Sequence, residues 1–437
     1  MKILSILAFL FSFTSLQAQQ VWSLEDCIDY ALKNNISLKQ AELNIGIKES
    51  QFLQSKLQVL PSLNAASSFN KNRGRYIDPF TNDFVEEVSS SLNLSYSANA
   101  TLFNGFKNYN QIKKAANESL KSIYDLETSK NDLISALALS YLQILFNEEL
   151  YITASKQLEL TKGQEERINT LVEAGSLAQG ELLNIQSQFA LEEQQLIQAE
   201  NQLNLSKLQL AQILELDQHQ DLKVLSLDLV IADFQLKENI NNDFTIALKN
   251  QSTIKSADLQ VKSAEYDLKI ARASYSPNLS IGYRNSTLYS ENAADMISFN
   301  DQLENNKQSG IALSLNIPIF NQWMTRTAVN QSKIQIENSI LNARLAKNQL
   351  RKNMEQAYAD QLAAYKRHQA ALKAVVAYKA SFGYINDRYE LGMVNSYEFN
   401  ESKNKLIKAE SDELQAKYDL IFKVKLYDFY TSLTFEL

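Results

Sequence analysis

The stretch Ala31-Leu32-Lys33-Asn34 returns 216 residues later as Ala247-Leu248-Lys249-Asn250. Six further residues recur at the same distance: Lys39, Ala41, Leu43, Glu49, Pro61 and Leu63 return as Lys255, Ala257, Leu259, Glu265, Pro277 and Leu279. At a distance of 217 residues, Leu102-Phe103-Asn104 matches Ile319-Phe320-Asn321, and Glu173-Ala174-Gly175 matches Glu390-Leu391-Gly392. A match at a fixed distance predicts that both halves share one order of elements, as a tandem internal repeat.

Each half contains very long helical stretches. The chain has only 10 glycines and 4 prolines in 437 residues, and a sequence so poor in helix breakers is typical of long helices. We expect helices over residues 106–170 and 179–215 in the first half and over 325–389 and 396–432 in the second. Gly175 and Gly392 mark the turns, because glycine commonly ends a helix. Seven-residue spacing of Phe189, Leu196, Leu203 and Leu210 predicts a coiled-coil seam on the first return helix.

Two segments in each half alternate between apolar and polar residues. Leu92, Leu94, Tyr96, Ala98, Ala100 and Leu102 alternate with serine, asparagine and threonine, and the second half repeats this over 279–284 and 311–319. Alternation predicts strands with one apolar and one polar face. We expect β-hairpins over about 62–102 and 278–319, with long polar loops over 71–87 and 285–307 facing solvent.

The predicted domains follow from these patterns. Residues 1–18 have the features of a signal peptide: Lys2, an apolar run over 3–13 and Ala18 at the end. The first repeat covers 19–230, with its helical tip near 175, and the second covers 231–437, with its tip near 392. We expect a compact connector over 217–242, packed on the outside of the helices.

Composition argues against several classes of function. Removing the signal peptide would leave a net charge of about −8, which disfavours nucleic acid as a partner. His219 and His368 are the only histidines and Cys27 is the only cysteine, so no Ser/His/Asp, Cys/His or histidine-rich metal constellation can be assembled. We expect no enzyme activity, no cofactor and no metal, both histidines on a surface or helix face, and Cys27 as a plain helix residue rather than an acylated one.

The strands suggest a membrane role. Each of the four strands is long enough for the roughly nine to eleven residues that a tilted membrane strand requires. Four strands are too few to close a barrel, and an open sheet edge is not tolerated in lipid. Three copies would supply twelve strands, with the apolar face toward lipid. Phe103 and Phe106 end the second strand, and Phe320 and Trp323 end the fourth, where an aromatic girdle at the membrane interface is expected. Alternatively, these four aromatic residues cap a soluble hydrophobic core.

Taken together, these features resemble the TolC family of outer-membrane efflux proteins. The features that carry the resemblance are the duplicated helix-hairpin-helix halves, Pro61 and Pro277 at the helix-to-strand junctions, the segment from Ser314 to Asn321, and the turns at Gly175 and Gly392. The resemblance covers essentially the whole mature chain. It implies an α+β, mainly α fold: a homotrimer with a twelve-stranded outer-membrane β-barrel continuous with a periplasmic α-helical barrel. Its implied partners are outer-membrane lipid, a periplasmic adaptor and an inner-membrane pump of the RND or ABC type.

The family also implies roles for residues at the tips. Glu398 and Glu401, one helical turn apart, fall where family members narrow the periplasmic aperture with acidic residues, and the spacing itself allows both to point to one side. Glu181 and Tyr389 fall at positions that link neighbouring helix pairs. Where the family's best-known member has an arginine after the tip glycine, this chain has Val394, so Arg388 or Arg167 would have to replace it. The plainer interpretation is that acidic residues simply favour the first turn of a helix.

The tip turns are the candidate adaptor-docking surface. It comprises Gly175, Ser176, Leu177, Gly392, Met393 and Val394. The leading functional prediction is an outer-membrane exit duct for the efflux of drugs and other small molecules. The alternatives are a duct of the same fold for type I protein secretion and, from another class, a periplasmic coiled-coil scaffold that is not a channel.

Overall fold

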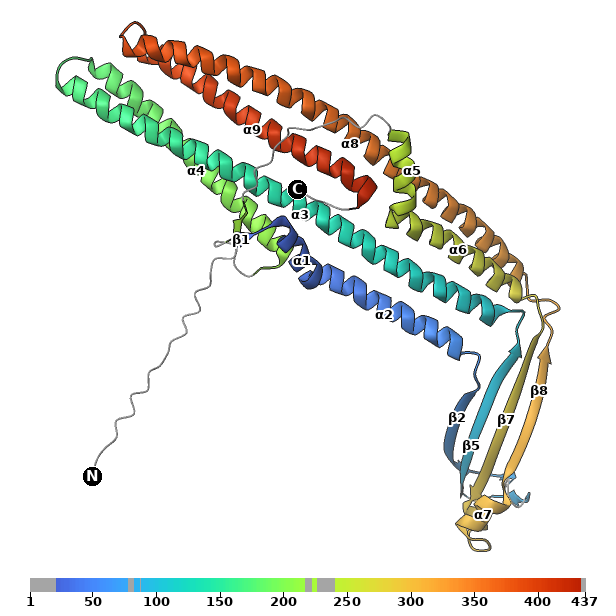
Figure 1. Cartoon of the computed structure of the whole chain (residues 1–437). Helices are drawn as coiled ribbons and strands as arrows, with labels where there is room; N and C mark the ends of the chain where they lie inside the picture. Colours follow the sequence, from blue (N-terminus) through green and yellow to red (C-terminus); the bar gives the residue numbers. More distant parts are fainter. Residues whose placement is uncertain (1–20, 78–81, 87, 217–221, 226–239, 434–437) are drawn as a thin grey trace, which may run out of the picture. The chain divides into compact units, whose positions relative to one another are not determined.

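The computed structural model describes residues 21–77, 82–86, 88–216, 222–225 and 240–433 (Figure 1). Most of these residues are helical, and the chain divides into two compact units. The first unit comprises residues 1–40, 127–251 and 349–437, and the second comprises 41–126 and 252–348. The predicted signal peptide at 1–18 and His219 lie outside the described residues.

The first unit is built from helices. It contains α1 (Leu24–Asn34), α4 (Gln179–Leu214), α5 (Ile240–Asn250) and α9 (Ser396–Ser432), with the C-terminal parts of α3 (Lys107–Glu173) and α8 (Met324–Glu390). α3 and α8 are each 67 residues long, which corresponds to about 100 Å at 1.5 Å per residue. Their near freedom from glycine and proline allows this length. The bounds of the four long helices agree with the predicted ones to within three residues.

The core of the first unit gathers apolar side chains from α1, α3, α4 and α9. Seam residues Leu203 and Leu210 of α4 belong to it, as the seven-residue spacing predicts. Cys27 and Tyr141 are fully buried there. The Tyr141 hydroxyl lies 2.8 Å from the carbonyl oxygen of Leu225, so it ties the described part of the connector to α3.

Little of the predicted connector is described. Residues 217–221 and 226–239 lie outside the described part, while β6 (Lys223–Val224) pairs in parallel with β1 (Val21–Trp22). Leu222 and Val224 are buried in the same core as Tyr141. This short stretch therefore packs against the helices.

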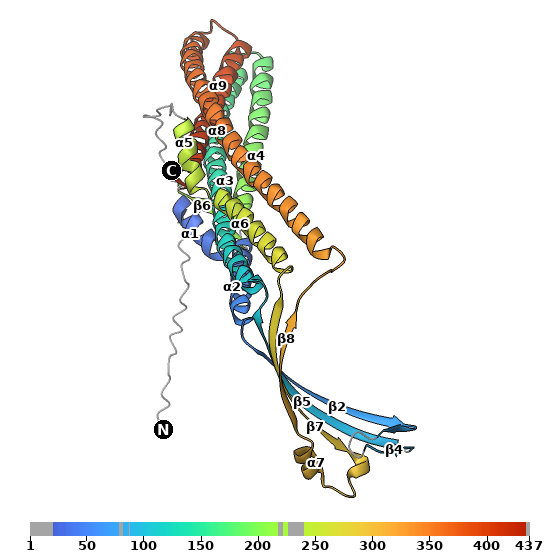
Figure 2. The same ribbon diagram turned by 90° about the vertical axis from the view of Figure 1, so that its right-hand side faces the viewer.

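The second unit contains most of α2 (Ile36–Leu57), α6 (Ser252–Ala273) and one antiparallel sheet. The sheet has the order β2-β5-β7-β8, with β2 (Ser62–Arg73), β5 (Val88–Phe103), β7 (Asn278–Ser290) and β8 (Gln308–Asn316). The strands lie side by side with a pronounced twist (Figure 2). All four predicted strands are present, and in the described part of the chain β2 and β8 each have a neighbour on one side only.

The region between β7 and β8 differs from the predicted loop. β7 continues to Ser290, and the segment from Glu291 to Lys307 contains a short 3-10 helix, η1 (Glu291–Ala293), and α7 (Phe299–Asn305). Gln302 is fully buried, and its side chain bonds to both the backbone N–H and the carbonyl of Ser290. The Gln302 side chain thus takes the place of a neighbouring strand for the backbone of Ser290. The polar composition of this segment predicted only a solvent-facing loop. The other predicted loop contains a small ribbon of β3 (Tyr76–Ile77) and β4 (Phe84–Val85).

The fourth strand is shorter than the alternation predicts. β8 ends at Asn316, so Ile317 and Ile319 are not strand residues. Pro318 explains the difference, because proline has no N–H to continue the ladder.

The two strand-to-helix junctions share an unusual backbone. Gly105 and Phe106 both have positive φ angles after β5, and Gln322 and Trp323 do so after β8. A Cβ on Gly105 would lie 2.5 Å from the Cβ of Ser276, so only glycine fits at this place. The equivalent Gln322 carries a full side chain.

Candidate functional site

Both helical tips of the first unit end in the same glycine turn. Gly175 has φ +72° and Gly392 has φ +71°, the left-handed conformation that glycine adopts at little cost. The N–H of Ser176 donates to the Leu171 carbonyl at 2.8 Å, and the N–H of Met393 donates to the Arg388 carbonyl at 2.8 Å. These bonds satisfy carbonyls at the ends of α3 and α8, a Schellman arrangement.

The predicted docking residues lie on the surface of these turns. Gly175, Ser176, Leu177, Gly392 and Met393 are exposed, whereas Val394 is partly buried. The exposed side chain of Leu391 extends the apolar part of this surface. The residues are accessible to a partner, and adaptor docking stays a prediction.

The predicted aperture carboxylates Glu398 and Glu401 are exposed on α9. The Asn395 side chain accepts from the N–H of Glu398 at 2.9 Å and so caps the helix, leaving the Glu398 carboxylate on its first turn. Glu401 differs, because Lys405 lies 2.6 Å from its carboxylate and has its pKa raised mainly by that hydrogen bond. Lys405 was not predicted from the sequence, although the four-residue spacing of opposite charges was visible.

Glu181 and Tyr389 have neighbours within one chain that the sequence did not indicate. Ser396, at the start of α9, donates a hydrogen bond to the Glu181 carboxylate, which joins the two tips. The Tyr389 ring stacks on Phe399 with 4.5 Å between ring centroids. Burial raises the pKa of the Tyr389 hydroxyl, nearby Glu181 raises it further, and Arg167 opposes them. Arg388 instead lies over the ring of Tyr384.

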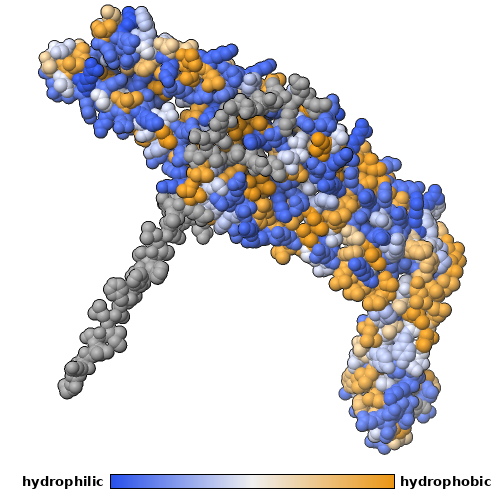
Figure 3. All heavy atoms as spheres, viewed as in Figure 1, coloured by the Kyte–Doolittle hydropathy of each residue, from blue (hydrophilic) through white to orange (hydrophobic). Residues whose placement is uncertain are grey.

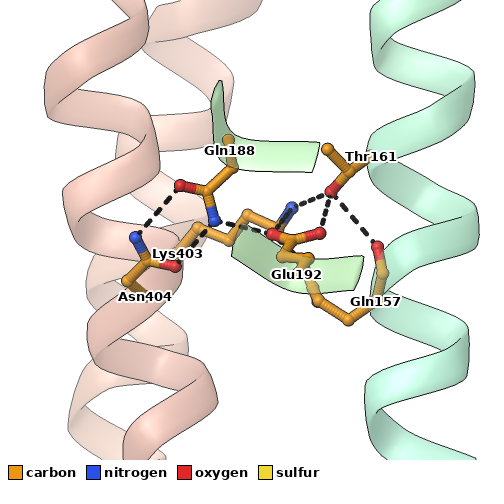
Figure 4. A network of polar contacts seen from close by, with 6 residues as sticks. All are labelled: Gln157, Thr161, Gln188, Glu192, Lys403 and Asn404. Atoms are coloured by element: carbon orange, nitrogen blue, oxygen red, sulfur yellow. Dashed lines mark hydrogen bonds and ion pairs between the residues drawn. The ribbon is translucent and has the colours of Figure 1, made fainter. Parts of the chain in front are cut away.

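A buried polar network lies between α3, α4 and α9, and the sequence interpretation missed it. Glu192 is 2% exposed and Lys403 is 5% exposed. Lys403 Nζ lies 3.1 Å from the Glu192 carboxylate and donates to the Thr161 hydroxyl at 2.6 Å. Gln157, Thr161 and Gln188 donate to the same carboxylate, and Gln188 also bonds to Asn404 (Figure 4). Such an arrangement satisfies a buried charge that would otherwise be costly.

A sequence signal for this network existed. Glu192 lies three residues after seam position Phe189. Lys403 lies four residues before Ile407, which begins a seven-residue series on the second return helix with Leu414 and Ile421. Opposite charges thus occupy core-facing positions of the two return helices, where a polar residue can fix the register of paired helices. Burial lowers the pKa of the Lys403 ammonium, and Glu192 partly offsets this effect.

His368 lies on a helix, which agrees with the predicted surface or helix-face position, but it is buried. It is 5% exposed on α8, and its Nε2 lies 3.2 Å from the Glu413 carboxylate. Within the described residues no cluster of three or more histidine, cysteine or acidic side chains could hold a metal. Cys27 is fully buried, which raises the pKa of its thiol to about 12, with Asp26 as a smaller cause.

The sheet of the second unit separates polar and apolar side chains, because directly paired residues point to the same side. One face carries Leu63, Ala65 and Phe69 of β2, Leu92, Leu94, Tyr96, Ala98 and Ala100 of β5, Leu279, Ile281 and Tyr283 of β7, and Ile311, Leu313 and Leu315 of β8. The other face is dominated by serine and asparagine. The register of all four strands therefore preserves the alternation seen in the sequence.

The four predicted interface aromatics are exposed at the junctions with α3 and α8. Phe103 packs edge-on against Phe106, with 5.7 Å between ring centroids, whereas Phe320 is 75% exposed. The guanidinium of Arg326 lies over Trp323, 4.1 Å from the ring centroid. Apolar side chains gather at this end of the sheet (Figure 3). The interface role of these four residues stays a prediction.

In the part of the chain that the structure describes, no helix combines the length and the apolar character needed to span a bilayer.

Comparison with known proteins gives consistent results. The probable outer membrane lipoprotein SilC of Salmonella typhimurium is 24% identical over 325 residues, which is 72% of this chain, and the chain spans 65% of the length of SilC. The Campylobacter jejuni CmeC outer membrane channel has a TM-score of 0.80 at 16% identity, covering 93% of this chain and 85% of CmeC. The open state of the Neisseria gonorrhoeae MtrE outer membrane channel has a TM-score of 0.73 at 19% identity, covering 94% of this chain and 88% of MtrE. These solved structures share the fold.

A family model also matches both halves of the chain. The model of a family described as outer membrane efflux protein matches residues 27–215 and 245–423, most of both halves. Its members are channel proteins rather than enzymes, and their location is the outer membrane, with the helical part in the periplasm. The chain belongs to the outer membrane efflux protein family.

Proposed function

We propose that three copies of this chain form a passive exit duct through the outer membrane for small molecules. The single observation that carries the proposal is the four-stranded sheet, with one apolar face, one polar face and, among the described strands, an open edge at both β2 and β8. In lipid these edges need partners, because no water is available to satisfy their N–H and carbonyl groups. A neighbouring copy supplies them.

Three copies give a closed barrel of twelve strands, an even number inside the usual range. The apolar face then meets lipid, and the serine and asparagine face lines water. Phe103, Phe106, Phe320 and Trp323 anchor the barrel at the membrane interface. The strand directions support closure. Each neighbouring pair of strands in the sheet is antiparallel, so β8 runs opposite to β2, and β8 of one copy can pair antiparallel with β2 of the next.

The internal repeat supplies the helical part of the duct. Apart from η1, α7 and the two-residue strands, both halves have the order helix, helix, strand, strand, helix, helix. The corresponding helices have matching lengths: 11 residues in α1 and α5, 22 in α2 and α6, and 67 in α3 and α8. We propose the repeats as 19–230 and 231–437, joined by the connector at 217–242 and preceded by a signal peptide. Six similar helical hairpins in the trimer form a periplasmic tube.

The tips supply the adaptor contact and the gate. The exposed turns around Gly175 and Gly392 are the docking surface for a periplasmic adaptor, which joins the duct to an inner-membrane pump of the RND or ABC type. Glu398 and Glu401 narrow the periplasmic aperture. The pairing of Glu401 with Lys405 makes Glu398 the main source of negative charge there, while Glu181 and Tyr389 hold the two hairpins together.

A membrane assay separates the duct from the scaffold alternative. The duct requires detergent for extraction, migrates as a trimer in unboiled sodium dodecyl sulfate gels, and gives stepwise conductance in planar bilayers. A protein released by washing with carbonate, without conductance, would support the periplasmic scaffold instead. Export of a polypeptide in cells that also supply an ABC-type pump would favour type I secretion over small-molecule efflux.

Substitution of Gly392 tests the docking surface. Gly392→Leu introduces a side chain at φ +71° and should weaken adaptor capture while leaving detergent-stable trimers intact. Gly163→Leu, in the interior of α3 where a Cβ would have no neighbour within 4 Å, is the control. Loss of trimers in Gly392→Leu would make the glycine a folding residue only.

A further inference from the structure

The polar face of the sheet carries a single charged side chain. Among the paired residues of the described sheet, this face contains serine, asparagine, glycine, alanine and a few others, and Arg284 of β7 is the only ionised one. Arg284 is exposed and stands at the midpoint of β7, six residues from either end. It therefore lies halfway along the membrane-crossing strand.

The neighbours of Arg284 leave its guanidinium free. It pairs with Ser97 on β5 and with Gly310 on β8, and the next residues on the same face of β7 are Gly282 and Ser286. All four are small and uncharged. Among the described residues no carboxylate forms an ion pair with Arg284, and no hydrogen bond engages its side chain. The five donors of the guanidinium therefore face open space.

The first half of the chain has no counterpart to this charge. At the repeat distance of 216 residues, Ser68 corresponds to Arg284 and lies on the same polar face of β2. The charge is thus a property of the second hairpin only. A trimer carries three such guanidinium groups, at one depth.

We infer that Arg284 forms an anion-binding ring in the lumen of the duct, selective for solutes bearing carboxylate, phosphate or sulfonate groups. The inference rests on the proposed trimeric barrel, in which the polar face lines water. Low-dielectric walls focus the field of the three charges, which raises the local concentration of anions. The planar guanidinium binds such groups through two parallel hydrogen bonds. The ring therefore acts on anions, opposite in sign to the acidic aperture.

Block of single-channel current by a polyvalent anion tests this inference. The purified full-length protein is inserted into bilayers of neutral phosphatidylcholine in KCl, and ferrocyanide is added on the side of the β-hairpin loops. We expect Arg284→Ser to weaken the block by about tenfold or more, because the substitution removes the charged hydrogen-bond donors that bind the anion. Arg284→Lys should retain most of the block, and Ser68→Arg, which adds three charges, should strengthen it.

A chemical variant keeps the test valid if Arg284→Ser assembles poorly. In Arg284→Cys channels already in the bilayer, a cationic methanethiosulfonate reagent should restore the block, whereas an anionic one should not. The native Cys27 thiol does not interfere, because it is fully buried. Equal block of wild-type and Arg284→Ser channels would overturn the ring and leave the duct standing. Absence of any conductance from the wild-type protein would overturn the duct, and the ring with it.

Discussion

At the scale of single residues, the buried Glu192–Lys403 ion pair needs hydrogen-bond partners from the surrounding side chains. Both charges are removed from water, and the stability of the pair depends on the donors that Gln157, Thr161 and Gln188 supply. Removal of one partner leaves an uncompensated buried charge, whereas removal of both does not. The network therefore contributes more to the register of α3, α4 and α9 than to net stability.

A double-mutant cycle measures the contribution of the Glu192–Lys403 pair to the free energy of unfolding. Lys403→Met alone should lower the free energy of unfolding by about 3–5 kcal/mol, and Glu192→Leu combined with Lys403→Met should recover much of that loss. Thermal unfolding in detergent, followed by circular dichroism at 222 nm, reports both. Glu401→Gln is the matched control, because its pair with Lys405 is exposed and should contribute less than about 1 kcal/mol. Additive losses in the double variant would contradict the account of the network.

Cys27 provides a test of burial that depends on pH. Its pKa is raised from 9.0 to about 12 by burial, so the folded protein keeps the neutral thiol while the unfolded chain ionises near pH 9. The stability from the neutral thiol is complete below about pH 9 and is lost as the pH rises through about 12. At pH 8 we expect no reaction with dithionitrobenzoate until guanidinium unfolds the chain. Rapid modification of the folded protein would show that the α1 core is open.

At the scale of elements, the two strand-to-helix junctions distinguish two reasons for a glycine: a positive φ angle and a lack of space for a Cβ. Gly105 combines a positive φ with a contact that excludes a Cβ, whereas Gln322 has a positive φ and a side chain of its own. Both junctions re-aim the chain from sheet to helix. Only the first depends on glycine for space.

This difference predicts unequal effects of alanine. Gly105→Ala should destabilise the protein by about 1–3 kcal/mol, because backbone strain adds to the clash with Ser276. Gln322→Ala removes side-chain atoms without adding any, and its effect should stay within about 1 kcal/mol. The heat resistance of the trimer on gels compares the two variants. Equal effects would show that the approach of Ser276 does not constrain this junction.

The sequence predicted the elements well where one physical rule dominates. Long helices followed from the scarcity of glycine and proline, and the strand faces followed from strict alternation, which the register of β5 and β7 confirms. It failed where a side chain replaces a backbone partner, as Gln302 does beside Ser290. It also missed Glu192 and Lys403, because each charge is satisfied by residues of other helices that only the fold brings together.

At the scale of the whole molecule, the proposed trimer converts the difference between the two halves into function. The second half carries Glu398 at its tip and Arg284 on its sheet, while the first half has Glu181 bound to Ser396 and Ser68 at the place of the arginine. Glu398 and Arg284 would each occur three times around the axis. Aperture and lumen would thus carry opposite signs.

Ion selectivity tests the acidic aperture. Glu398→Gln should reduce cation preference in planar bilayers more than Glu401→Gln does, because Lys405 already neutralises Glu401. Glu398→Lys combined with Glu401→Lys should abolish or reverse the preference. The reversal potential in a KCl gradient measures this. Unchanged selectivity in the double variant would remove both residues from the aperture.

The most direct test of the shared barrel is cross-linking between the edge strands. Cysteine replaces Ala66 on β2 together with one of Ala312, Ser314 or Asn316 on β8, all on the polar face, and membranes are oxidised before the protein is boiled in sodium dodecyl sulfate without reductant. The account predicts that at least one pair gives covalent dimers and trimers, with nothing larger. Each control with only one of the two substitutions, which keeps the buried native Cys27, should stay monomeric. Monomers alone for every pair, or a ladder that continues beyond three copies, would contradict a barrel shared by three chains.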